Sequence, residues 1–144
     1  MSQVSKSVIV NRPPADVIEY IADVDNHPAF IGPLKSVADI SGDPRTPGSS
    51  WTWSFILAGV ELSGAAETVK YEPARVYSFR TTSGVRSTFV YSVEPADGGT
   101  RLNLDVEYDV PENVLGRVKK PVLERLNDAD GQRAVENLKA ILDS

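Results

Sequence analysis

The sequence contains no cysteine and a single histidine, His27, among its 144 residues. The absence of cysteine excludes a disulfide framework, thiol catalysis, zinc ribbons and iron–sulfur clusters. One histidine excludes a multi-histidine metal site, and a Ser-His-Asp triad would have to use His27. No GxSxG motif supplies the serine of such a triad. We therefore expect neither a metal nor a cofactor.

Basic residues and long apolar runs are also scarce. The chain has 15 Lys and Arg residues against 20 Asp and Glu residues, a net charge of −5 at pH 7. That sign is wrong for a nucleic-acid or an anionic-membrane surface. No apolar stretch approaches the ~18 residues that a membrane span requires, and the N-terminus has no apolar signal core. These features predict a cytoplasmic single domain over residues 1–144, with no nucleic-acid partner and no integral membrane association.

Turn residues divide the beginning of the chain into a strand and short helical segments. Residues 7–10 are typical of a short strand. The pair Pro13-Pro14 favours the start of a helix, and residues 15–24 carry their apolar side chains on one face. Residues 25–28 end that helix, and residues 29–31 form a turn or a second small helix.

From residue 34 to residue 110 the pattern is that of antiparallel strands separated by turns. The clearest hairpin turns at residues 96–99, and it pairs Val93 with Leu102, Tyr91 with Leu104 and Phe89 with Val106. Another hairpin is predicted to turn at Gly59-Val60, because glycine accepts the positive φ that a type II′ turn requires first. Its predicted register pairs Leu57 with Leu62, Phe55 with Gly64 and Trp53 with Ala66. Large rings opposite small residues would leave space above the sheet.

The last part of the chain carries apolar residues at helical spacing. Pro111 is expected to end the last strand, and Pro121 to separate a short turn from a helix over residues 122–142, about 30 Å long. The expected buried stripe comprises Val114, Leu115, Val118, Val122, Leu126, Ala129, Ala134, Val135, Leu138, Ile141 and Leu142. Gly131 lies inside this helix and weakens it by roughly 1 kcal/mol relative to alanine. We expect the helix to cover the apolar face of the sheet.

Several short segments, in their order and spacing, resemble those of a known family. They are VNRPPADV at residues 10–17, IADVD at 21–25, PAF at 28–30, YEPARV at 71–76, TSG at 82–84, GGTRL at 98–102, EYDVP at 107–111 and LKAIL at 138–142. The whole chain resembles the START-related polyketide cyclase/dehydrase and lipid transport family, in the Bet v 1-like superfamily. The resemblance implies an α+β helix-grip fold, in which a curved antiparallel sheet of about seven strands wraps around a long C-terminal helix. Two short helices follow the first strand, and a largely apolar cavity lies between sheet and helix.

The resemblance implies a function of binding or transport. Family members bind lipids, sterols, quinones, polyketides or hormones, and a minority catalyse aromatic cyclisation or dehydration. We therefore expect a small hydrophobic or aromatic ligand, such as a lipid, a quinone or a polyketide, in the cavity. One alternative is a polyketide cyclase or dehydratase that uses Tyr or His proton transfer in the same cavity. Another is a protein-interaction module with a filled cavity, and the chain is expected to be a monomer or a homodimer.

The expected ligand-binding residues are apolar or aromatic side chains on the inner face of the sheet and on the C-terminal helix. They are Phe30, Trp51, Trp53, Phe55, Phe79, Phe89, Tyr91, Leu104, Tyr108, Leu115, Val118, Val122 and Leu126. The polar or acid–base candidates are His27, Tyr91 and Tyr108. Either tyrosine has two interpretations: it anchors or protonates a ligand carbonyl, or its hydroxyl bonds to the backbone or to water.

The remaining polar candidates favour ordinary structural roles. His27 lies between a helix end and Pro28, where a solvated loop position is favoured over a functional one. Alternation from an inward Phe79 directs Arg80 outward. The carboxylates of Asp105, Glu107 and Asp109 share one face of the last strand, which favours a solvated face over a weak divalent-cation site.

Overall fold

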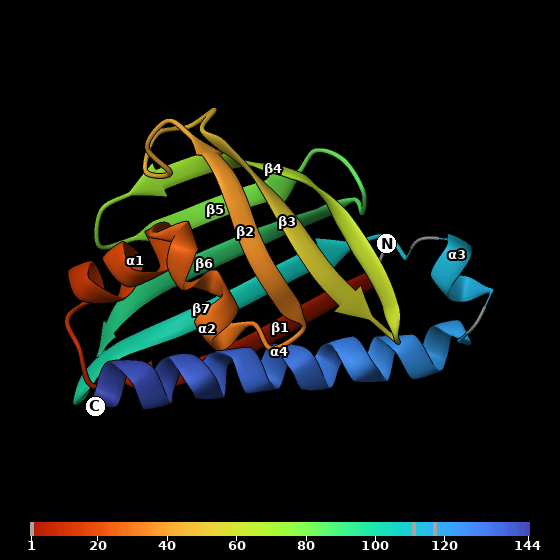
Figure 1. Ribbon diagram of the computed structural model, residues 1–144. Helices are drawn as coiled ribbons and strands as arrows, with labels where there is room; N and C mark the ends of the chain where they lie inside the picture. Colours follow the sequence, from red (N-terminus) through yellow and green to blue (C-terminus); the bar gives the residue numbers. More distant parts are fainter. Residues whose placement is uncertain (1, 111, 117) are drawn as a thin grey trace.

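A curved antiparallel sheet and a long C-terminal helix form two packed layers (Figure 1). The computed structural model describes residues 2–110, 112–116 and 118–144. The strands are β1 Ser2–Val10, β2 Leu34–Ser41, β3 Ser50–Leu57, β4 Val60–Glu72, β5 Val76–Thr81, β6 Ser87–Ala96 and β7 Gly99–Tyr108. The helices are α1 Pro14–Ala22, the 3-10 helix η1 Val24–Asn26, α2 His27–Phe30, α3 Glu112–Leu115 and α4 Lys120–Asp143. The predicted helix-grip arrangement is confirmed, while Pro111 lies outside the described residues.

The sheet runs in the order β1-β7-β6-β5-β4-β3-β2, with every neighbouring pair antiparallel. Its first strand lies beside its last, from Ser2 opposite Tyr108 to Val10 opposite Thr100. The register shifts within β2 and again between Thr68 and Lys70 of β4. Such irregularities bend a strand and increase its twist. The sheet consequently arches over α4 (Figure 1).

One of the two predicted hairpin registers is correct. The β6–β7 hairpin pairs Val93 with Leu102, Tyr91 with Leu104 and Phe89 with Val106, as predicted. The β3–β4 register is wrong by two residues, because the turn is made by Ala58 and Gly59, with φ of 52° and 79°. Two positive φ values are the mark of a type I′ turn, with its glycine second. Trp53 therefore lies opposite Gly64, and Phe55 lies opposite Leu62. A shift of two residues leaves every side chain on its predicted face.

The short helices close one end of the arch. Helix α1 begins at Pro14 and buries Val17, Ile18 and Ile21 against the sheet. It ends at Ala22, two residues earlier than predicted, and η1 then leads into α2. Helix α2 contacts both β2 and α4, so the connection from α1 to β2 spans from the sheet to the C-terminal helix.

Helix α4 lies along β1. Lys6 Nζ pairs with Asp128 Oδ2 at 2.9 Å, and Lys139 Nζ donates a hydrogen bond of 2.7 Å to the carbonyl oxygen of Ile9. Between these contacts, a Cβ atom on Gly131 would lie 2.6 Å from Cγ1 of Val4. The glycine that weakens the isolated helix thus permits its close approach to β1.

The predicted buried stripe of α4 is correct only in its second half. Ala134, Val135, Leu138 and Leu142 are buried. At the start of the helix the buried residue is Leu123, whereas Val122 and Leu126 are each 43% exposed. Leu115, in the preceding helix α3, is 40% exposed. Leu123 packs with Val114 and Leu57 in a second, smaller apolar cluster, in which Val118 takes part. That packing fixes the rotation of the first turns and directs Val122 and Leu126 outward.

Candidate functional site

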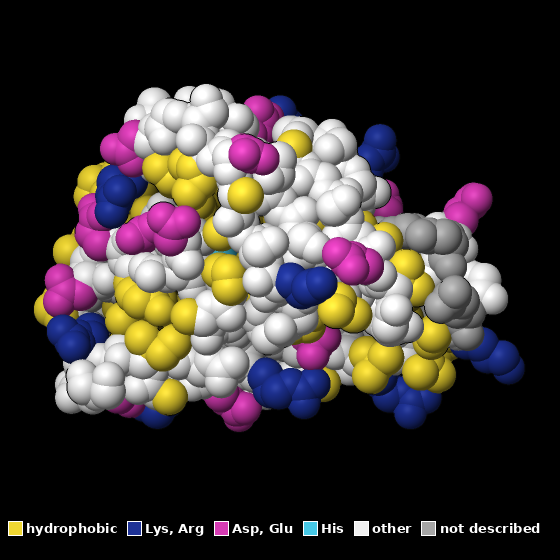
Figure 2. All heavy atoms as spheres, in the orientation of Figure 1, with side chains coloured by type: hydrophobic (Ala, Val, Ile, Leu, Met, Phe, Trp, Pro, Cys, Tyr) yellow, Lys and Arg dark blue, Asp and Glu magenta, His cyan; other side chains and the backbone are white. Residues whose placement is uncertain are grey.

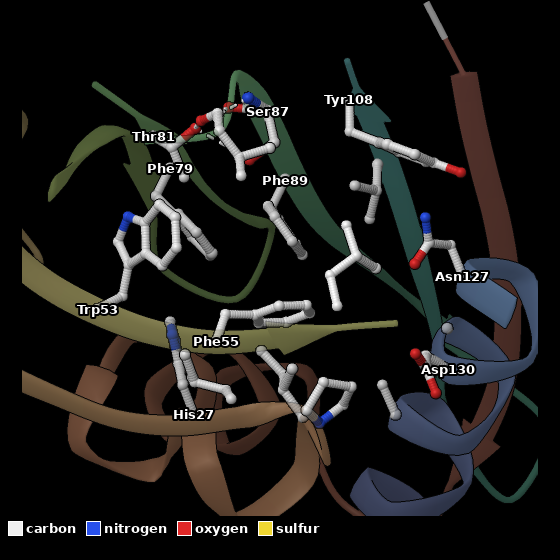
Figure 3. A pocket seen from close by; sticks show the side chains of 18 of the residues that line it. His27, Trp53, Phe55, Phe79, Thr81, Ser87, Phe89, Tyr108, Asn127 and Asp130 are labelled. Carbon is white, nitrogen blue, oxygen red and sulfur yellow. Dashed lines mark hydrogen bonds between the residues drawn. The ribbon is translucent and has the colours of Figure 1, made fainter. Parts of the chain in front are cut away.

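A cavity of about 160 Å³ lies between the concave face of the sheet, α2 with the segment that follows it, and α4 (Figure 3). Strand side chains form most of its wall, because inward positions on β3, β5, β6 and β7 converge on it. The predicted residues around it are Trp51, Trp53, Phe55, Phe79, Phe89, Tyr91, Leu104, Tyr108 and His27. Phe30 is buried in the adjacent core, and Leu115, Val118, Val122 and Leu126 do not line the cavity.

Aromatic rings make the wall of the cavity on the strand side. Phe79 and Phe89 stack with their ring centroids 4.7 Å apart and an interplanar angle of 9°. Trp53 lies over its cross-strand partner Gly64, and its Nε1 donates a hydrogen bond of 3.0 Å to the carbonyl oxygen of Ala65. The space above Gly64 is therefore filled by the indole of Trp53 itself. The cavity lies beyond these rings, on the side of Phe55 and α4.

His27 is buried, with 1% of its surface exposed, so the favoured interpretation as a solvated loop residue is wrong. Its ring stacks on Phe79 at 5.3 Å between centroids and meets the edges of Phe30, Trp51 and Tyr77. Burial lowers the pKa of His27 to about 4, against a partial rise caused by its hydrogen bond to the Ile21 backbone. The imidazole is thus neutral at pH 7.

Tyr91 and Tyr77 are cross-strand partners with different hydrogen bonding. The Tyr77 hydroxyl lies 3.0 Å from Oγ1 of Thr68, and burial raises the pKa of Tyr77 to about 12. The Tyr91 hydroxyl is buried with no hydrogen-bond partner among the described residues, and burial raises its pKa further. Tyr91 also lines the cavity.

Two polar pairs that the sequence analysis missed lie at the cavity wall (Figure 3). Thr81 and Ser87 bond to each other, since the Ser87 backbone N–H donates to Thr81 Oγ1 at 2.8 Å. On the helix side lie Asn127 and Asp130, and Asp130 Oδ1 accepts from Arg133 at 2.9 Å. A sequence signal was present for the helical pair: both residues share the inner side of α4 with Gly131 and Ala134.

The remaining polar candidates lie outside the cavity. Arg80 points outward and pairs with Glu67, with 2.7 Å between Arg80 Nε and Glu67 Oε1. On the outer face of β7, Asp105 accepts from Ser5 at 2.8 Å and Glu107 accepts from Gln3 at 3.0 Å. Within the described residues, no group of three or more His, Cys, Asp or Glu residues is placed to hold a metal ion. Nor does any described helix have the length and apolarity to cross a membrane.

A sheet that grips a C-terminal helix over an apolar cavity defines a START- or Bet v 1-like helix-grip protein. The chain belongs to the polyketide cyclase / dehydrase and lipid transport family, whose sequence model matches residues 1–143. No curated protein matches the chain in sequence.

Solved structures share this fold at low sequence identity. A protein from Thermus thermophilus has a TM-score of 0.82 at 15% identity, over 97% of this chain and 96% of that one. A START superfamily protein from Mycobacterium smegmatis has a TM-score of 0.76 at 15% identity, over 99% and 98% of the two chains. The Zhui aromatase/cyclase from a Streptomyces species has a TM-score of 0.71 at 16% identity, over 98% and 93%. The fold is therefore shared with at least one enzyme, the Zhui aromatase/cyclase.

Proposed function

We propose that this protein binds a small hydrophobic or aromatic ligand, such as a lipid, a quinone or a polyketide, in the cavity between the sheet and α4. The observation that carries the proposal is the cavity of about 160 Å³ walled by Trp53, Phe55, Phe79 and Phe89. An apolar cavity of roughly 150 Å³ already takes up a benzene-sized molecule. Burial of apolar ligand surface supplies the affinity, at roughly 25 cal/mol per Å².

The polar groups of the cavity are better suited to orienting a bound ligand than to catalysing a reaction of it. Efficient general acid–base catalysis needs a pKa near the working pH. Burial moves the pKa of His27 down to about 4 and that of Tyr91 up, away from neutrality in both cases. A neutral imidazole and an unpartnered hydroxyl remain able to hydrogen-bond a ligand hydroxyl or carbonyl. Ligand binding is consequently favoured over the cyclase or dehydratase alternative.

The cyclase alternative rests on the family and on the fold shared with the Zhui aromatase/cyclase. It predicts turnover of a polyketide-like substrate with a bell-shaped pH profile that loses one limb in His27→Gln. Turnover indifferent to His27, Tyr91 and Tyr108 would count against it. The third alternative, an interaction module with a filled cavity, is disfavoured by the open space beside Phe55.

Native mass spectrometry of freshly purified protein, with an organic extract of the same sample analysed in parallel, tests the proposal. A stoichiometric apolar adduct is expected. The dye 8-anilinonaphthalene-1-sulfonate provides a second readout, because its fluorescence rises in an apolar site.

A cavity-filling variant makes the dye experiment specific. Val106 of β7 lines the cavity, so Val106→Phe is expected to abolish dye binding. Val69 is 44% exposed and does not line the cavity, so Val69→Phe is the matched control and should bind as the wild type does. Equal dye binding by the two variants, with no adduct in the native spectrum, would rule out the proposed cavity function.

A further inference from the structure

Large apolar side chains are exposed in α3 and at the beginning of α4. Leu115, Val122 and Leu126 are 40%, 43% and 43% exposed. Val122 and Leu126 are four residues apart and so lie on the same side of the helix. Figure 2 shows hydrophobic side chains gathered over this end of α4, with basic side chains beside them. Adjacent exposed apolar side chains of this kind mark an interaction site.

The charges around these residues are segregated by sign. Lys119, Lys120 and Arg125 are exposed and form no ion pair with any residue that the structure describes. The acidic residues of the same turns face β1: Glu124 accepts a hydrogen bond of 2.7 Å from Ser2, and Asp128 pairs with Lys6. Of the acidic residues described in α3 and the first turns of α4, Glu112 and Asp128 remain exposed.

We define the apolar–basic patch as Lys119, Val122, Arg125 and Leu126. Its sign is opposite to the net charge of −5 of the whole chain. The net negative charge of the whole chain disfavours binding to an anionic surface. The basic side chains gathered in the patch favour such binding at one end of the molecule. Such an asymmetry orients the protein at an anionic surface, because that surface attracts the basic patch and repels the acidic remainder of the protein.

The apolar–basic patch borders the cavity. Leu57 lines the cavity and also packs in one cluster with Leu123, the residue after Val122 of the patch. Asn127, the residue after Leu126, lines the cavity from α4. A surface that covers this patch therefore comes to lie against the same end of the cavity.

We propose that the apolar–basic patch docks this protein on the surface of an anionic lipid bilayer. Val122 and Leu126 enter the interface between headgroups and acyl chains, as the apolar side of an interfacial helix does. Lys119 and Arg125 contact the anionic headgroups. A protein partner is disfavoured because lysine is depleted at protein–protein interfaces. The docking requires no ligand in the cavity, so it stands independently of the proposed function.

Sedimentation of the ligand-free protein with vesicles tests the proposal. We expect binding to vesicles of mixed phosphatidylglycerol and phosphatidylcholine, weakened by high salt, and little binding to phosphatidylcholine alone. Each basic side chain near an anionic surface strengthens binding about fivefold, so Lys119→Gln combined with Arg125→Gln should weaken it about 25-fold. Val122→Ser combined with Leu126→Ser should weaken it at least about tenfold.

The matched control is Val69→Ser combined with Lys70→Gln, one exposed apolar and one exposed basic residue of β4. It should bind anionic vesicles as the wild type does. Circular dichroism and thermal unfolding establish that each variant is folded, which is expected because every changed side chain is exposed.

Four results would overturn the proposal. They are absence of wild-type sedimentation, equal binding to both vesicle types, an equal loss in the β4 control, and a wild-type dimer that Val122→Ser with Leu126→Ser dissociates. The last would assign the patch to a second copy of the chain. Dye binding measured without vesicles tests the cavity function separately. If the dye does not bind, the cavity function is ruled out, whereas the vesicle result is unaffected.

Discussion

His27 Nε2 lies 2.8 Å from the carbonyl oxygen of Ile21, six residues earlier in the chain. A carbonyl oxygen only accepts, so Nε2 carries the proton, and in the neutral ring Nδ1 keeps its lone pair. This bond ties α2 to the last turn of α1 and fixes the tautomer of a ring that is enclosed by aromatic side chains. Burial of the ring, and not this bond, keeps the histidine uncharged.

Acid is expected to destabilise the protein through His27. The ordinary pKa of histidine is 6.5, whereas burial lowers the pKa of His27 to about 4 in the folded protein. Between these values the unfolded chain binds more protons than the folded one, so the free energy of unfolding falls as the pH falls. The stabilisation present above pH 6.5 is lost progressively down to pH 4, by roughly 3 kcal/mol.

Urea unfolding of the wild type and of His27→Gln between pH 7 and pH 4 measures this loss. Glutamine retains an amide N–H that can donate to the Ile21 carbonyl, and it does not titrate. The free energy of unfolding of the variant should therefore change less over this range. Equal pH dependence in the two proteins would contradict a buried neutral histidine.

Removing the hydroxyl of Tyr91 is expected to leave the protein as stable as the wild type or to stabilise it by about 1 kcal/mol, because a buried hydroxyl without a partner is costly. Tyr77→Phe is the matched comparison. It leaves Thr68 Oγ1 without its bond of 3.0 Å to Tyr77 and should destabilise the protein by about 1 kcal/mol. Thermal and urea unfolding of both variants give the difference. The opposite order of stability would show that Tyr91 is the bonded tyrosine in solution.

Alternation predicted the inner face of the sheet because it depends only on neighbouring residues. Phe89 and Tyr91 lie inward as expected, and the β6–β7 register follows from the turn before Gly99. The β3–β4 turn was ambiguous, since Gly59 suits the first position of a type II′ turn and the second position of a type I′ turn. Only the positive φ of Ala58 distinguishes the two.

The parts of the site that sequence reasoning missed depend on contacts between distant segments. Apolar residues at positions 122, 123 and 126 fit two rotations of α4, and the choice is made by Leu123 packing against Val114 and Leu57. His27 is buried by Trp51 and Phe79, which lie on other strands. Asn127 and Asp130 were missed because polar side chains on a helix usually face water.

Phe55→Ala is expected to weaken dye binding about tenfold, because the ring lines the cavity and its loss removes apolar contact with the bound molecule. Leu126→Ala is the matched control. The sequence predicted a similar effect for it, but Leu126 is 43% exposed and lies outside the cavity, so no change is expected. Fluorescence titration with 8-anilinonaphthalene-1-sulfonate measures both affinities. Equal affinities for the two variants would place the dye outside the cavity.

Gly64→Ala is expected to destabilise the protein by about 1–3 kcal/mol, as overpacking of a filled site does. A Cβ atom on Gly64 would lie 2.1 Å from the carbonyl oxygen of Ser83 and 2.9 Å from Cζ2 of Trp53. The indole cannot move aside freely, because its Nε1 is bonded to the carbonyl oxygen of Ala65. We therefore expect a change in tryptophan fluorescence together with a lower urea midpoint.

Gly32→Ala is the matched control for Gly64, because no atom lies within 4 Å of a Cβ built at Gly32. Its backbone also lacks the positive φ that would penalise alanine, so it should unfold at the wild-type urea concentration or slightly above it. If both alanine variants unfold at the same concentration, Trp53 does not lie on Gly64 in solution. The aromatic wall of the cavity would then differ from the one described, because the position of the Trp53 indole determines where the cavity begins.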